Sequence, residues 1–112
     1  MKLFYLILLL WLGDPHTPPS DCEKFAEKYI KPLSIDGYVK RKTEDPNYYH
    51  IDIAGQGRIL TLKIMKNKIG KELYSFIGDS TLIVKKQDEL YIRVIDFHSN
   101  RINVRHFETL CE

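Results

Sequence analysis

The pattern of apolar and polar residues changes twice along this chain of 112 residues. An unbroken apolar run, Leu3 to Leu12, comes first. After a proline-rich stretch, apolar residues recur at the spacing of a helix, and from Tyr38 onward they alternate with polar residues as in strands. The pattern therefore predicts an apolar leader, one helix and then a series of strands.

The helical segment begins after Ser20, because Ser20 and Glu23 form the S-x-x-E pattern of a capping box. The apolar residues that follow are spaced so that they form one stripe: Cys22, Phe25, Ala26, Tyr29 and Ile30. Pro32 predicts that the helix ends near Lys31. We therefore expect an N-terminal amphipathic helix that is stabilised by packing its stripe against the remaining chain.

The remaining chain predicts about six short strands separated by turn residues. The segments are 38–43, 49–53, 60–65, 81–85, 90–97 and 102–110. The stretch 67–76 is ambiguous, since Leu73, Phe76 and Ile77 would also lie on one helical turn. Strands and helices do not alternate, which favours an antiparallel sheet. The expected fold class is α+β, with one N-terminal helix packed on a curved antiparallel sheet or a small barrel.

The apolar run at the N-terminus predicts export. It is shorter than the roughly 20 apolar residues that a membrane span needs, and Lys2 gives it a positive start, as in a signal peptide. We expect residues 1–20 to be signal peptide and linker and 21–112 to be one small α+β domain. The protein would then be periplasmic, envelope-associated or extracellular; a signal segment retained as an anchor is the alternative.

Export gives a meaning to the two cysteines, Cys22 and Cys111. In an oxidising compartment an even number of cysteines predicts a disulfide, and two cysteines allow one intramolecular pairing. We expect Cys22, on the apolar stripe of the helix, to meet Cys111 on a core strand. Unpaired buried thiols or an intermolecular bridge are the alternatives.

Basic residues suggest a binding surface, which we assign to Lys40, Arg41, Lys42, Lys85 and Lys86. Acidic residues nearly balance them, leaving a net charge of +2. This charge and the predicted export disfavour a nucleic-acid partner, so an acidic partner protein or an anionic envelope component is preferred. A solvated face with lysines that protect edge strands is the preferred interpretation of these residues.

The motif Gly78-Asp79-Ser80 resembles the GDS motif of the GDSL esterases, although Thr81 stands where that motif has leucine. The resemblance covers three residues, and it would make Ser80 a nucleophile. The β-branched run after Ser80 favours a turn that starts a strand, with a positive φ at Gly78. His50, His98 and His106 allow a metal site, but solvated histidines are preferred, and no catalytic residue, metal ligand or cofactor is assigned.

We therefore expect an exported, non-enzymatic domain that binds a partner protein or an envelope component, with the membrane contacted only through the signal segment. A hydrolase that uses Ser80 is the runner-up. A secreted inhibitor or immunity-type protein is the third hypothesis, and it differs from the first only in its partner.

Overall fold

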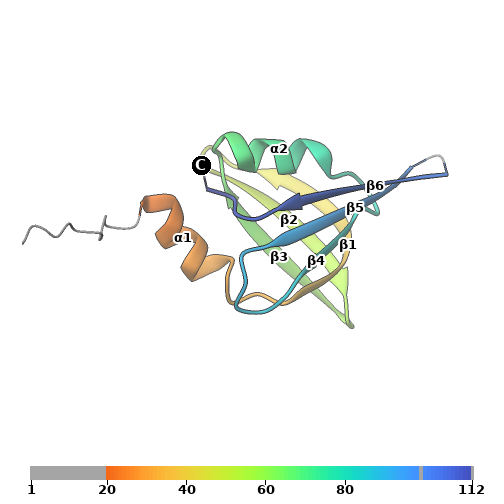
Figure 1. Cartoon of the computed structure of the whole chain (residues 1–112), viewed down its shortest axis with the longest axis horizontal. Helices are drawn as coiled ribbons and strands as arrows, with labels where there is room; N and C mark the ends of the chain where they lie inside the picture. Colours follow the sequence, from red (N-terminus) through yellow and green to blue (C-terminus); the bar gives the residue numbers. More distant parts are fainter. Residues whose placement is uncertain (1–19, 99, 112) are drawn as a thin grey trace, which may run out of the picture.

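The computed structural model describes residues 20–98 and 100–111, and the predicted signal segment lies outside this part. The described chain is a mixed α+β fold with a six-stranded antiparallel sheet and two helices (Figure 1). In chain order the elements are α1 (Asp21–Tyr29), β1 (Ile35–Glu44), β2 (Tyr48–Gly55), β3 (Arg58–Met65), α2 (Lys68–Phe76), β4 (Leu82–Lys85), β5 (Ile92–His98) and β6 (Arg101–Phe107). Neither helix of the described residues is long and apolar enough to cross a membrane.

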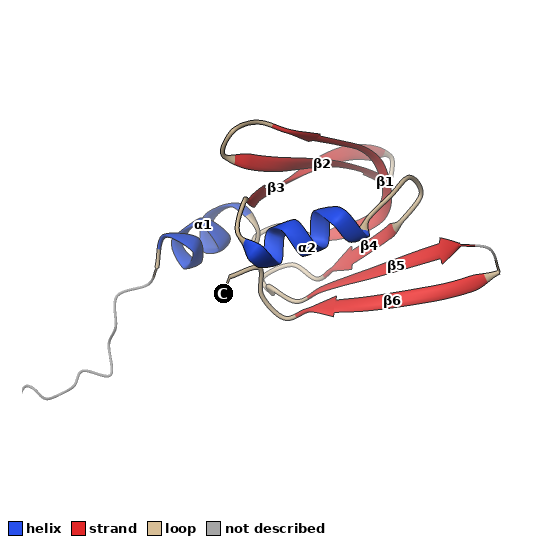
Figure 2. Cartoon of the chain, turned by 90° about the horizontal axis from the view of Figure 1, so that it is seen from above, coloured by secondary structure: helices blue, strands red, loops and turns tan. Residues whose placement is uncertain are grey.

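The strands are ordered β3-β2-β1-β4-β5-β6, and every neighbouring pair is antiparallel. The sheet curls around α2, as Figure 2 shows, but it does not close, because β3 and β6 are not paired with each other. The antiparallel sheet is therefore confirmed, and the small-barrel alternative is wrong. We call the face that packs on α2 the inner face and the opposite face the outer face.

Alternation of side chains between the two faces builds the core on the inner face. In β2, Tyr49, Ile51 and Ile53 are buried while their neighbours are partly exposed. The other strands add inward side chains that are also buried, among them Ile35, Val39, Leu62, Ile64, Ile83, Ile92 and Val94. One contiguous apolar cluster results, which also contains Ala26 and Ile30 from the region of α1.

The first helix begins as the sequence indicates. Ser20 Oγ accepts a hydrogen bond from the backbone of Glu23, whose carboxylate accepts one from the Ser20 backbone, so the capping box is present. Ala26 is buried, and the Phe25 ring stacks on Tyr48 at 5.3 Å between centroids. The helix lies beside β3, at one edge of the sheet (Figure 1).

The ambiguous segment is a second helix, α2, whose first turn is capped by Asn67. The Asn67 side chain accepts a hydrogen bond of 2.7 Å from the Gly70 backbone. Gly70 lies against the Met65 carbonyl, where a Cβ atom would have no room, so glycine lets the helix approach the end of β3 closely. Leu73 is fully buried, and the Tyr74 ring stacks on Tyr49 at 4.1 Å.

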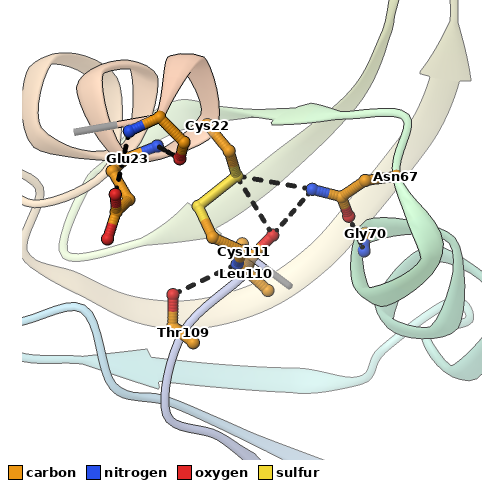
Figure 3. The surroundings of a disulfide bond; sticks show 8 residues. Cys22, Glu23, Asn67, Gly70, Thr109, Leu110 and Cys111 are labelled. Carbon is orange, nitrogen blue, oxygen red and sulfur yellow. Dashed lines mark hydrogen bonds between the residues drawn. A yellow bond between two sulfur atoms is a disulfide. The ribbon is translucent and has the colours of Figure 1, made fainter. Parts of the chain in front are cut away.

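A disulfide joins Cys22 of α1 to Cys111, with 5.7 Å between the Cα atoms (Figure 3). The predicted pairing is thus confirmed, but Cys111 is not on a strand, because β6 ends at Phe107 rather than near Leu110. Asn67 donates one hydrogen bond to the Leu110 carbonyl at 2.9 Å and another to Cys22 Sγ at 3.4 Å. The disulfide and the hydrogen bonds of Asn67 therefore connect α1, the start of α2 and the C-terminal segment.

Candidate functional site

The structure separates the five basic residues that the sequence suggested as a surface. Strand β1 contains a bulge, because Val39 pairs with Ile53 while Arg41 pairs with Asp52, which leaves Lys40 as an extra residue. The shift turns Lys42 to the inner face, opposite Ile51. There Lys42 Nζ donates hydrogen bonds of 2.9 Å to the carbonyls of Tyr74 and Ile77 at the C-terminal end of α2. Lys42 therefore caps a helix.

Lys85 is also a structural residue, with only 2% of its surface exposed. Its Nζ donates to three backbone carbonyls, those of Lys31 at 3.0 Å, Leu33 at 2.6 Å and Lys86 at 2.8 Å. Burial lowers the pKa of Lys85, and the nearby acidic residues partly oppose this effect. The ammonium group thus holds the loop after α1 against β4, and it is not available to a partner.

Lys40, Arg41 and Lys86 are exposed, but Arg41 already has an ionic partner. Its guanidinium donates to Asp52 Oδ2 at 2.8 and 3.0 Å, and Thr61 donates to the other oxygen at 2.7 Å. The hydrogen bond from Thr61 and that from Arg41 lower the pKa of Asp52. This polar network lies on the outer face, in a shallow hollow of about 450 Å³ that Lys40 and Ile59 also line.

A second feature of the outer face, which sequence reasoning missed, is a continuous row of apolar residues. Directly paired positions run across all six strands, because each residue is the register partner of the next. In the order of the strands the row is Ile59, Ala54, Tyr38, Leu82, Ile95 and Val104. Side chains that are directly opposite in an antiparallel pair lie on the same face, so the row forms one stripe.

The stripe is partly exposed at Ala54, Leu82 and Ile95 and well exposed at its other positions. Exposed fractions are 59% for Ile59, 49% for Tyr38 and 44% for Val104, and the next pair on the same face, Phe97 and Ile102, has 53% and 65%. These five are the majority of the seven large exposed apolar residues of the described chain. We call the row together with Phe97 and Ile102 the outer apolar stripe. Contiguous exposed apolar surface of this kind is typical of interaction sites.

Ser80, the candidate nucleophile, lies in a turn. The Ser80 backbone donates to the Val39 carbonyl at 3.2 Å, and Thr81 N–H donates to the Gly78 carbonyl at 3.2 Å. The residue with positive φ is Ser80, at 67°, so the expected positive φ at Gly78 is wrong. Among the described residues no hydrogen bond links the Ser80 side chain to a histidine, and β4 rather than a helix follows it.

The described histidine side chains are paired at distant places in the sheet. His50 Nε2 lies 2.8 Å from Asp45 Oδ2 at the β1–β2 turn, whereas His106 Nδ1 contacts the Tyr91 hydroxyl on the far hairpin. His16 and the His98 side chain lie outside the described part. Within residues 20–98 and 100–111, no group of three or more His, Cys, Asp or Glu side chains is placed to hold a metal ion.

Comparison with protein-family models, with curated proteins and with solved structures found no match to this chain.

Proposed function

We propose that this chain is an exported, non-enzymatic domain that binds a partner protein through the outer face of its sheet. The observation that supports this proposal is the outer apolar stripe. A sheet with one buried face usually presents polar side chains on the other face. Here the outward positions carry tyrosine, phenylalanine and branched aliphatic residues across the full width of the sheet.

A protein is a better partner for this face than an anionic envelope polymer. Two of the five basic residues expected at such a surface, Lys42 and Lys85, donate to backbone carbonyls, and Arg41 is paired with Asp52. Protein interfaces combine an apolar centre that contains aromatic residues with a polar rim. Tyr38 and Phe97 supply aromatic rings, and the Arg41–Asp52–Thr61 network supplies polar groups on the same face, beside Ile59.

Export is supported by two features that are independent of each other. The Cys22–Cys111 disulfide is typical of proteins in oxidising compartments. The apolar run Leu3 to Leu12, outside the described residues, has the length of a signal-peptide core.

The proposal is tested by photo-crosslinking in the source cells. A photo-reactive amino acid replaces Tyr38 or Ile59 in the full chain, and a control variant carries it at Glu27, an exposed position on α1. We expect an adduct with another protein from the two stripe positions and none from Glu27. Absence of adducts from the stripe, or adducts only with a second copy of the chain, would overturn the proposal. If the captured protein is an enzyme that the chain inhibits, the chain is an inhibitor or immunity-type protein.

A further inference from the structure

The outer apolar stripe ends at an open edge of the sheet, β6. Among the described residues, the backbone of β6 forms hydrogen bonds only with β5. All residues of β6 before Phe107 are exposed, so the core covers neither face of this part of the strand. An edge strand with free backbone groups is able to pair with another extended segment.

The two faces of β6 differ in chemistry. Ile102 and Val104 point to the outer face and continue the stripe, whereas Arg101, Asn103 and Arg105 point to the inner face. This assignment follows from the register, since Phe107 pairs with the buried Ile92 and alternate residues share a face. A strand that is added to this edge would therefore have apolar neighbours on one face and cationic neighbours on the other.

A shallow, open groove on the inner side strengthens this contrast. It has a volume of about 430 Å³, lies between α2 and β6, and is lined by Lys68, Lys71, Glu72, Ser75, Phe76 and Arg105. Three of these residues are cationic and one is acidic. The Arg105 guanidinium lies 5.5 Å from the Phe76 ring centroid and 4.9 Å from that of Phe107, which holds the charge beside the groove.

We propose that β6 accepts an extended segment of the partner protein as a seventh strand, and that this segment alternates apolar and acidic residues. Backbone hydrogen bonds would join it to β6, as in other cases of strand addition. Its apolar side chains would extend the outer apolar stripe, and its carboxylates would face Arg105 and Lys71. The inference rests on the proposed protein-binding function and adds the site and the chemistry of the partner.

A second copy of this chain is a poorer occupant of the edge. Pairing β6 with itself would bring the two arginines of each copy, Arg101 and Arg105, together on one inner face, and like charges at neighbouring positions destabilise a sheet. The opposite edge, β3, is flanked by α1, where Lys63 Nζ lies 5.2 Å from the Tyr29 ring centroid. The cationic groove lies on the inner side of β6, so β6 is the edge to which we assign the added strand.

The probe is a peptide of the same seven-residue length as β6, with alternating glutamate and valine. It is added to the full chain, and amide hydrogen exchange is measured. We expect protection of the β6 amides, and binding stronger by about tenfold than that of a matched lysine–valine peptide. A glutamate–valine peptide with N-methylated backbone amides keeps the side chains and should not bind.

Charge reversal provides the decisive variant. Arg105→Glu should abolish the preference for the glutamate peptide, because it changes the charged lining of the groove from three cations and one acid to two of each. Arg93→Glu is the matched control, because it changes the net charge equally on the same hairpin but lies on the outer face, and it should keep the original preference. For the wild type, equal binding of the two peptides, protection at β3 instead of β6, or no binding at millimolar peptide would overturn the inference. An unchanged preference in Arg105→Glu would also overturn it. Crosslinks from Tyr38 in that case would leave the proposed function intact.

Discussion

The β2–β3 hairpin and the β5–β6 hairpin have similar lengths but differ in burial. The strands contain eight residues each in the first and seven each in the second. In the first hairpin, the inward residues Ile51, Ile53, Leu62 and Ile64 are buried over most of the strand length. In the second, burial is confined to the end near the loop before β5, at Ile92, Val94 and Phe107.

The difference shows which residues folding requires. Beyond Val94 the inner face of the second hairpin becomes polar, with Asp96 accepting a hydrogen bond of 3.4 Å from Thr81. The apolar residues farther out, Phe97 and Ile102, lie on the outer face and are exposed, so they contribute little to the core. Because the core does not need them, their apolar character supports the proposed binding role. Substitutions that separate stability from binding can test this distinction.

The largest expected effect is the loss of the disulfide, which anchors α1 beside the first hairpin. The cysteines are 89 positions apart, and removal of a native disulfide typically lowers the free energy of unfolding by about 2–5 kcal/mol. We expect such a loss for Cys22→Ser combined with Cys111→Ser, measured by urea unfolding with circular dichroism. A reductant should destabilise the wild type similarly and leave the double variant unaffected; equal stability of the two proteins would contradict the assignment.

A matched pair of isoleucine substitutions compares the hairpins directly. Ile51 is fully buried in β2, so Ile51→Ala should lower the free energy of unfolding by about 2–5 kcal/mol. Ile102 is 65% exposed in β6, so Ile102→Ala should change it by less than about 0.5 kcal/mol. Peptide binding at β6 should weaken only in the second variant. A large loss of stability from Ile102→Ala would show that the second hairpin belongs to the core.

Substitutions of two adjacent lysines, Lys85 and Lys86, test how much β4 contributes to stability. Strand β4 lies in the middle of the sheet, between β1 and β5. Lys85→Met keeps the aliphatic stem but removes the ammonium donor from the carbonyls of Lys31, Leu33 and Lys86. The Lys31 carbonyl keeps its hydrogen bond from the Asp88 backbone. We expect a loss of about 1.5–3 kcal/mol, the range for hydrogen bonds that involve a charged group. Lys86→Met, at an exposed position, is the control and should change the unfolding midpoint little. Similar effects of both substitutions would argue against a structural role for Lys85.

The sequence predicted the parts of the fold that depend on local patterns. Alternation of apolar residues located the six strands, and the Ser20–Glu23 pattern located the capping box. The cysteine count predicted the disulfide because it left one intramolecular pairing. Helix α2 has nine residues, as α1 does, but it stayed ambiguous because Gly70 rather than a glutamate follows its N-cap, Asn67, at the third position. It is held by contacts with β2 and β3 that no local pattern reveals.

The candidate binding surface depends on strand register, which is not a local property. The bulge at Lys40 reverses the direction of every side chain after it in β1, so the inward position of Lys42 was not visible. The outer apolar stripe likewise needs the pairing of six strands. Residues such as Tyr38 and Ile59 carried a signal, because they are apolar at outward positions of alternating segments. That signal becomes interpretable only once the strand order is known.

The smallest predicted effect concerns acid stability at the β1–β2 turn, in the first half of the sheet. The hydrogen bond with His50, followed by those from the backbone of Asn47 and Tyr48, lowers the pKa of Asp45 from 3.8 to about 2. Since the folded-state pKa lies below the unfolded-state value, the stabilisation is fully present above that value and is lost as the pH falls through about 2. Asp45→Asn keeps an acceptor but removes this dependence.

The urea midpoints of the wild type and of Asp45→Asn should therefore be measured as the pH is lowered from neutral, through 3.8, to about 2. Other carboxylates titrate in both proteins, so the informative quantity is the difference between them, which should shrink toward low pH. The turn is exposed, and the difference should be small. A constant difference across the interval would mean that Asp45 does not change its pKa on folding. Peptide protection of β6 should be equal in the two proteins at neutral pH, because the turn and this edge lie in opposite halves of the sheet.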